Sequence, residues 1–323
     1  MLGVSTMNTL TIETYIKHND EDKVPVIFPL SDGQKPTDFL AANREFVDTL
    51  LEEHGAVLLR GFAIHSVSEF NRFALTYSPN LLEYNNRSTP RTRLGGNIYT
   101  STEYPSTMVI PQHNENAYTN SWPSKLLFYS AVAAESGGET PLADSRNILK
   151  RMDDKLIQRL EDQGLMYVRN YRAGLDLSWQ EVFQTDNKED VNKYCRDNTI
   201  AFEWLEGGEH LRTKQIVQAT TVHPKTKAKV WFNQINLFHI AATGIVGEEL
   251  IREYGLLNVP RNVYFGDGST IDEAILKQIN EAITAEKFCF TWVRGDILLV
   301  DNLLMSHGRN AYTGSRKIAV AMV

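Results

Sequence analysis

Cysteine is scarce in this chain, because Cys195 and Cys289 are the only two among 323 residues. The two thiols can form one bridge, but so few in a chain of this length are typical of a reducing compartment and not of a disulfide scaffold. The beginning of the sequence also lacks a basic segment followed by an apolar run, so it predicts no secretory signal. We therefore expect a cytoplasmic protein.

Long apolar runs and basic blocks are missing as well. No stretch approaches the roughly 20 apolar residues that a membrane-spanning helix needs, so we expect no contact with a membrane. The net charge is −7 and the isoelectric point about 5.7, and no Lys/Arg block indicates a basic face. These features exclude a typical nucleic-acid-binding protein and leave small-molecule chemistry or protein contacts.

The composition is that of a globular protein, since 42% of the residues are hydrophobic and can fill a sizeable core. The chain shows no internal repeat and no low-complexity linker. We therefore predict a single domain over 1–323, with an N-terminal helical segment to about residue 55 and an insertion at about 165–290. A large β-barrel enzyme with insertions has this length.

The periodicity of apolar residues indicates a mainly β protein with flanking helices. Helices are predicted at 38–54, 147–163, 246–254 and 270–284, the last with Thr270 and Glu273 at capping-box spacing. Strands are predicted at 56–62, 125–134, 215–222, 228–240, 288–293, 295–302 and 316–323, with a polar turn at 223–227. This order favours a sandwich or jelly roll over alternating βαβ units.

A possible metal site lies in the segment Ile110-Pro-Gln-His-Asn-Glu-Asn116. His113 and Glu115, two residues apart at a strand end, can both face one metal ion. A second histidine from a distant strand would complete a 2-His-1-carboxylate set, which leaves three adjacent positions open on Fe(II). A 2-oxo acid can take two of them and O2 the third. His18-Asn-Asp20 has the same spacing but follows no predicted strand, so we interpret it as surface.

Three more features support this site. The predicted strand GDILLVDN leads directly to His307, and Arg316 follows nine residues later at the start of the last strand. A guanidinium is the natural partner of the distal carboxylate of a dicarboxylic co-substrate. Thr140 lies in a Gly-rich bend 27 residues after His113, where its hydroxyl can add one hydrogen bond to that carboxylate.

At these residues the sequence resembles the taurine catabolism dioxygenase superfamily, and most of all its syringomycin-biosynthesis-oxygenase-like branch. The resemblance spans about residues 55–323 and is looser over 165–290. The segments that carry it are STPRTRLGGNIYTSTEYP (88–105), HNENAYTNSWPSKLLFY (113–129), GGETPLADSR (137–146), GDILLVDNLLMSHGR (295–309) and the approach Gly314-Ser-Arg316.

The resemblance implies a double-stranded β-helix, or jelly roll, that holds Fe(II) through His113, Glu115 and His307. It also implies that Arg316 and Thr140 bind 2-oxoglutarate, which is consumed with O2 to give succinate and CO2. The family member that acts on taurine has a second arginine on the last strand, whereas this chain reads Lys317-Ile-Ala-Val-Ala there. A sulfonate is therefore not the expected substrate. Halogenases of this chemistry lack the carboxylate, so Glu115 argues against halogenation.

We expect the substrate to be an amino acid or related small metabolite, free or tethered to a carrier protein. Residues near the predicted site that can contact it are Arg91, Asn114, Asn116 and Arg309, and the segments 80–106 and 165–200 are the predicted lid. Hydroxylation of a C–H bond is the expected reaction, with desaturation or cyclisation as alternatives. Two rival functions are a zinc hydrolase, which lacks its HExxH motif here, and a barrel-fold binding protein without metal.

Overall fold

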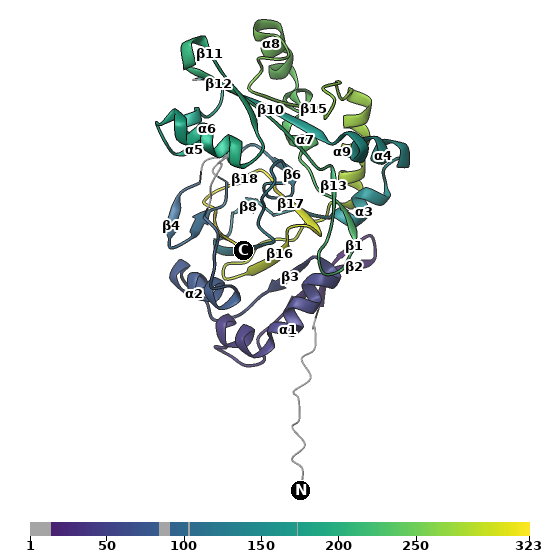
Figure 1. Cartoon of the computed structure of the whole chain (residues 1–323). Coiled ribbons are helices and arrows are strands. Elements are labelled where there is room, and N and C mark those ends of the chain that lie inside the picture. Colours follow the sequence, from purple (N-terminus) through teal and green to yellow (C-terminus); the bar gives the residue numbers. More distant parts are fainter. Residues whose placement is uncertain (1–13, 84–90, 103, 173) are drawn as a thin grey trace.

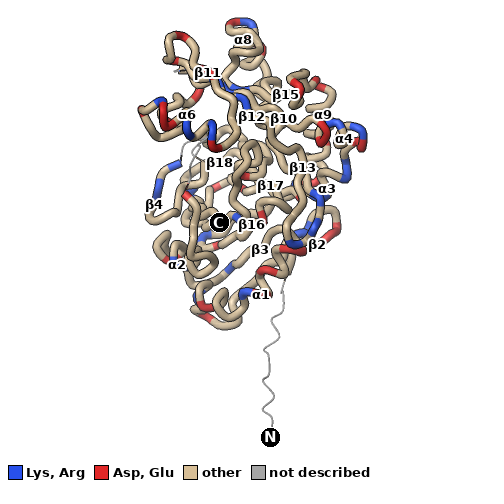
Figure 2. Tube along the Cα trace, viewed as in Figure 1, with Lys and Arg blue, Asp and Glu red and all other residues tan. Residues whose placement is uncertain are grey.

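The computed structural model describes residues 14–83, 91–102, 104–172 and 174–323 (Figure 1). Across these described segments, no helix combines the length and the apolar character that crossing a bilayer requires. Charged residues of both signs lie on the helices α1 (Pro36–His54), α4 (Asp154–Gln163) and α6 (Lys188–Asp197) (Figure 2). The structure is rich in β-sheet with helices around it, as the sequence predicts.

An eight-stranded sheet forms the largest layer of the structure. Its centre is built by strands from the end and the middle of the chain, which pair antiparallel. In spatial order its strands are β1 (Thr14–His18), β2 (Glu21–Ile27), β3 (Ala56–Leu59), β16 (Ile297–Asp301), β7 (Lys125–Val132), β19 (Lys317–Met322), β5 (Ile98–Thr100) and β4 (Arg93–Gly95).

The central strands of this sheet are apolar on both faces because both faces are covered. In β7, Leu127 and Tyr129 pack on the side of the N-terminal helices, whereas Leu126 and Phe128 pack on the opposite side. Successive side chains of a strand point to opposite faces, so a strand buried on both sides reads as a continuous apolar run. This is why the sequence predicts the central strands well.

Helices α1 (Pro36–His54) and α2 (Val67–Tyr77) cover the first face, at the purple and blue end of the ribbon in Figure 1. Helix α1 ends at Gly55, which adopts φ 75°, a left-handed conformation that glycine reaches without strain. The Ser66 hydroxyl caps α2 by accepting from the backbone N–H of Glu69. Helix α1 lies where the sequence predicts a helix.

The second face packs on a three-stranded sheet of β6 (Ile110–His113), β17 (Met305–Arg309) and β9 (Leu142–Asp144). Met305 and Leu142 from this small sheet share one hydrophobic cluster with Leu298 and Val320 of the large sheet. The two candidate histidines therefore lie in a layer that is held against the main sheet by apolar packing.

Residues 165–290 form a separate sheet with helices, in teal and green in Figure 1. Its strands in order are β11 (Ala201–Leu205), β12 (His210–Val217), β10 (Leu165–Tyr171) and β15 (Arg261–Phe265). The remaining elements are the pair β13 (Thr220–Val222) and β14 (Lys229–Trp231), the pair β8 (Ser136–Gly137) and β18 (Tyr312–Thr313), helices α3 (Ser145–Lys150), α4 (Asp154–Gln163), α5 (Trp179–Phe183), α6 (Lys188–Asp197), α7 (Ile235–Phe238), α8 (Ile245–Tyr254) and α9 (Glu273–Glu286), and short 3-10 turns at Glu206–Gly208 and Ile240–Thr243.

Two helix predictions need correction. The segment 147–163 is two helices, α3 and α4, because Asp153 caps a new helix by accepting from the N–H groups of Lys155 and Leu156. Helix α9 is capped by Asp272, which accepts from the N–H of Ile275, and not by Thr270. Asp153 lies inside the predicted helix and divides it, whereas Asp272 lies two residues after the predicted cap Thr270.

Other corrections concern strands. The predicted β run to residue 240 ends at β14, and the apolar residues that follow form α7, because a short apolar run does not distinguish helix from strand. Residues 288–293 form no strand, and Phe288 makes only an isolated bridge to Leu142. In the predicted N-terminal helical segment, β1 and β2 precede α1, so His18 ends a strand after all.

Candidate active site

The pairing of β6 with β17 brings the two candidate histidines together. His113 lies opposite His307 in the antiparallel register, and the centroids of their rings are 4.4 Å apart. Gly308 permits this close approach, since a Cβ atom there would lie 2.6 Å from the carbonyl oxygen of Ile110 and from Oε1 of Gln112. Neighbouring cross-strand positions can therefore present both imidazoles to one point.

Glu115 completes the cluster from the turn that follows β6. Its side chain is buried, and Oε2 lies 3.9 Å from Nε2 of His307. One ligand atom from each of His113, Glu115 and His307 lies within 4.8 Å of the other two. The chain turns away at Asn116, whose φ of 57° is a left-handed value that asparagine tolerates better than most residues. A divalent cation between these three atoms would be within reach of all of them.

Burial favours the neutral form of both imidazoles, and a hydrogen bond selects the tautomer of His113. Nδ1 of His113 lies 2.8 Å from the carbonyl oxygen of Pro111 and donates to it, which leaves Nε2 with its lone pair. Burial lowers the pKa of His113, and it lowers the pKa of His307 further, with contributions from His113 and Arg91. Metal ligation requires the neutral ring, so these shifts favour ligation.

Arg91 forms a buried ion pair with the cluster. One guanidinium NH2 lies 2.7 Å from Oε2 of Glu115, and each side chain is only 5% exposed. Removing one partner of such a pair would leave a buried charge without compensation, which is strongly destabilising. The pair therefore also fixes the direction of the carboxylate.

The two histidines of the cluster, His113 and His307, form one wall of a cavity. Its lining residues fall within 91–140 and 307–318. Three of them, Arg91, Ser101 and Thr102, belong to the predicted lid segment 80–106. The lining residues are Arg91, Ser101, Thr102, Ile110, His113, Phe128, Thr140, His307, Gly308, Arg309, Arg316 and Ile318. Part of the predicted lid, 84–90 and 103, falls outside the described residues.

Arg316 and Thr140, the two residues predicted to bind 2-oxoglutarate, both line this cavity. Nε of Arg316 donates to the carbonyl oxygen of Gly138 at 2.8 Å, and NH1 lies 3.4 Å from Oγ of Ser101. Burial and the nearby charge of Arg309 lower the pKa of Arg316 to about 10, so the guanidinium remains positive at neutral pH. This cation is held in place while it faces the cavity.

The hydroxyl of Thr140 is oriented by Trp292. The indole Nε1–H of Trp292 donates to Oγ1 of Thr140 at 3.0 Å. Because the hydroxyl oxygen accepts there, its own proton can be donated to another acceptor. Sequence reasoning did not single out Trp292 or Ser101, since neither matches a spacing rule.

The other three predicted contact residues have structural partners. Asn114 is buried and its Nδ2 donates to the carbonyl oxygen of Asn302 at 2.6 Å. The carbonyl of Asn116 accepts from Thr119 within the turn. The guanidinium of Arg309 donates to the carbonyl oxygens of residues 104, 105 and 108, which fastens the segment before β6 to β17.

Comparison with known proteins identifies the family. The family model described as "Taurine catabolism dioxygenase TauD, TfdA family" matches residues 28–322. The chain belongs to this TauD/TfdA family. The dapdiamide synthesis protein DdaC of Enterobacter agglomerans is 40% identical over 278 residues, which cover 86% of this chain and 84% of that protein. A clavaminate synthase-like protein of Arabidopsis thaliana is 31% identical over 335 residues, covering 97% and 98%.

Solved structures agree at the level of the fold. PvcB, described as an Fe, alpha-ketoglutarate dependent oxygenase from an isonitrile synthetic pathway, superposes with a TM-score of 0.54 at 12% identity, over 96% of this chain and 94% of that one. As a TauD/TfdA family member, the protein is a dioxygenase that uses iron, 2-oxoglutarate and O2. The family and the cofactor expectations from the sequence are thus confirmed.

Acid is expected to destabilise the metal-free TauD/TfdA protein partly through its two clustered imidazoles. Their pKa values lie below 6.5 in the fold and return to about 6.5 on unfolding, so between these values the unfolded chain binds more protons. The free energy of unfolding should therefore fall as the pH falls from 7 to 5. Urea unfolding at several pH values measures this slope.

The double variant His113→Gln, His307→Gln should show a shallower slope than the wild type. His65→Gln, at an exposed position, is the control and should leave the slope unchanged. If the double variant kept the full slope, the two imidazoles would not be held neutral by the fold.

Proposed function

We propose that this protein hydroxylates an unactivated C–H bond of an amino acid or related small metabolite, and that it converts 2-oxoglutarate to succinate and CO2 in doing so. His113, Glu115 and His307 would hold the iron in a double-stranded β-helix, within one domain. The observation that carries the proposal is that these three ligand atoms lie within 4.8 Å of one another. Two of the three residues, His113 and His307, line the same cavity as Arg316.

The residues present fit a ferrous ion. Two imidazole nitrogens and one carboxylate form the facial set of non-haem oxygenases and leave positions for a chelating 2-oxo acid and O2. Burial keeps the imidazoles neutral, and Arg91 holds the carboxylate. When bound, the iron with 2-oxoglutarate and O2 supplies the oxidising power that breaks a C–H bond, while the protein positions that bond and excludes water.

The co-substrate end of the cavity fits the distal carboxylate of 2-oxoglutarate. Arg316 brings a positive charge, and Thr140 brings a hydroxyl proton that Trp292 leaves available. Arg309 adds a second positive charge nearby, and its repulsion contributes to the lowered pKa of Arg316. A carboxylate between these groups would gain charge-assisted hydrogen bonds and relieve the repulsion between the two cations.

The substrate class is inferred from the relatives and from the site. One relative is named for dapdiamide synthesis and another for its likeness to clavaminate synthase, which favours an amino-acid-derived substrate. Arg91 lines the cavity beside the metal cluster and is our candidate partner for a substrate anion. Desaturation or cyclisation would use the same site. Glu115 occupies the position that a halogenase leaves open.

Anaerobic addition of Fe(II) and 2-oxoglutarate is expected to produce a weak visible charge-transfer band. The His113→Ala variant should lose this band because the metal loses a ligand. His239→Ala is the matched control and should keep the band, because His239 is a buried histidine whose Nε2–H donates to the carbonyl oxygen of Ile271. A band that survived in His113→Ala would overturn the proposed iron site, and no band in the wild type would favour a zinc hydrolase or a binding protein.

Removing the co-substrate groups is expected to raise the KM for 2-oxoglutarate. Hydrogen bonds to a charged group contribute about 1.5–3 kcal/mol, so Arg316→Gln should raise KM about 10- to 100-fold. Thr140→Val keeps the shape and loses one hydrogen bond to the same carboxylate, so a rise of about tenfold, at the low end of this range, is expected. Succinate release at varied 2-oxoglutarate concentrations measures both.

Arg261→Gln is the matched control for Arg316, because Arg261 forms its ion pair with Asp176 away from the cavity. It should leave the KM for 2-oxoglutarate within about twofold. An Arg316→Gln variant with an equally unchanged KM would contradict the assignment of this arginine to the co-substrate.

A further inference from the structure

The side chain of Asn302 holds the backbone of Glu115 from both sides. Its Oδ1 accepts from the N–H of Glu115 at 2.7 Å, and its Nδ2 donates to the carbonyl oxygen of Glu115 at 3.0 Å. Glu115 lies beyond the end of β6, so no strand of the sheet provides these two bonds. The amide of Asn302 therefore takes the place of a neighbouring strand at the residue that carries the carboxylate.

The same residue ties three segments of the chain together. Nδ2 also donates to the carbonyl oxygen of Pro123 at 2.8 Å, and the backbone N–H donates to that of Ser124 at 3.0 Å. The carbonyl oxygen of Asn302 accepts from Nδ2 of Asn114 at 2.6 Å. Asn302 is fully buried, so water cannot replace any of these partners.

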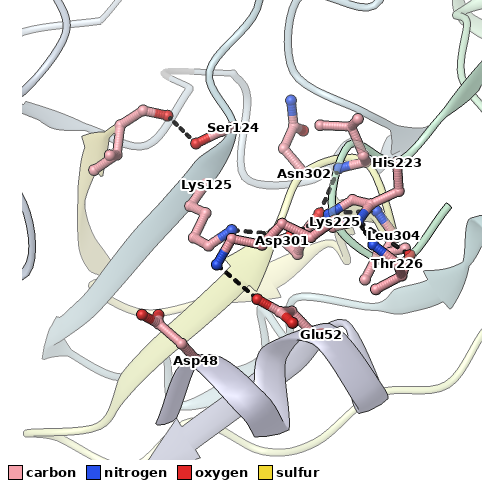
Figure 3. Close-up of polar contacts among 12 residues, drawn as sticks. Asp48, Glu52, Ser124, Lys125, His223, Lys225, Thr226, Asp301, Asn302 and Leu304 are labelled. Atoms are coloured by element: carbon pink, nitrogen blue, oxygen red, sulfur yellow. Dashed lines mark hydrogen bonds and ion pairs between the residues drawn. The ribbon is translucent and has the colours of Figure 1, made fainter. Parts of the chain in front are cut away.

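The neighbouring Asp301 keeps this turn from moving. Its Oδ1 accepts from the N–H groups of Leu303 and Leu304, while Oδ2 lies 3.0 Å from Nζ of Lys125 and 3.1 Å from Nε2 of His223. Figure 3 shows the contacts of Asp301 with its partners, and shows the side chain of Asn302 directed away from that group. The turn that carries Asn302 is thus fixed at its base.

Asn302 connects the segment that carries His307 with the segment that carries His113 and Glu115. It begins the turn from β16 to β17, five residues before His307, and its side chain reaches the segment of His113 and Glu115. Any shift of β17 relative to β6 would therefore also move the backbone of Glu115. The side chain makes the positions of the three ligands dependent on one another.

We propose that Asn302 is a positioning residue that sets the direction of the Glu115 carboxylate relative to the two imidazoles. It does not touch the metal itself. The proposal rests on the iron site proposed above. Partners of this kind that orient a metal ligand typically change metal affinity about 10- to 100-fold when they are lost.

Cobalt(II) binding to the full chain tests the proposal, with the metal alone as the probe. The Asn302→Ala variant should bind Co(II) at least tenfold more weakly than the wild type. The visible bands of its bound Co(II) should shift because the backbone that carries the Glu115 carboxylate loses two hydrogen bonds. Asn302→Ser, which keeps a polar group at the buried position, is measured in parallel. Circular dichroism establishes that each variant is folded at the temperature of the titration.

Asn170→Ala is the matched control. Asn170 is buried to the same degree, and its side chain also makes three hydrogen bonds, to the carbonyls of Leu257 and Val259 and from Nε of Arg212, in the sheet of β10. Its loss should lower the melting temperature as the loss of Asn302 does, but should leave the Co(II) affinity and spectrum unchanged.

The outcomes separate the two proposals. If the wild type binds no Co(II), or if His113→Ala binds it equally well, the iron site itself is wrong. If the wild type binds it through His113, and both Asn302 variants keep the affinity within twofold and the same spectrum, the positioning role is wrong while the iron site stands. A loss of affinity in Asn170→Ala equal to that in Asn302→Ala would also overturn the positioning role.

Discussion

Strands β6 and β17, which lie nearly two hundred residues apart in the sequence, pair so that His113 faces His307 across the ladder. Every other feature of the site follows from this contact. Gly308 keeps the strands close, the turn after β6 brings Glu115 to the same point, and Asn302 joins that turn to the approach to β17. The apolar packing of Met305 and Leu142 against the eight-stranded sheet supports the pairing from behind. The hydrophobic core thus determines where the ligand atoms lie.

The charges of the site favour the binding of a metal cation at one place and of an anion at another. Burial disfavours protonation of both imidazoles, which suits a metal cation, and one carboxylate beside them is balanced by Arg91. On the other side of the cavity, burial and the nearby charge of Arg309 lower the pKa of Arg316. Two like charges so placed are unfavourable without a counter-ion, so the proposed binding of the 2-oxoglutarate carboxylate there would relieve this repulsion.

The sequence predicts the parts of this protein that depend on local pattern. Helix α1 with its stop at Gly55, the central strands and the spacing of His113 and Glu115 are all visible in the residue order, because apolar periodicity and end signals are local. The division of 147–163 into two helices is not visible in the sequence, because the apolar periodicity continues across the cap at Asp153. What no spacing reveals is the set of partners joined only by the fold, such as Asn302 with Glu115 or Arg309 with the carbonyls of 104–108. Those side chains look like ordinary loop or strand residues until the strands are paired.

The central claim is that one ferrous ion is held by three side chains at the junction of β6 and β17, beside a co-substrate bound to Arg316. An anaerobic crystal structure with Fe(II) and 2-oxoglutarate tests it most directly, with anomalous scattering at the iron edge to locate the metal. The account predicts a single strong iron peak in contact with Nε2 of His113, a carboxylate oxygen of Glu115 and Nε2 of His307, and a 2-oxoglutarate carboxylate on the guanidinium of Arg316. An iron peak elsewhere in the molecule, or one that lacks any of these three ligands, would contradict it.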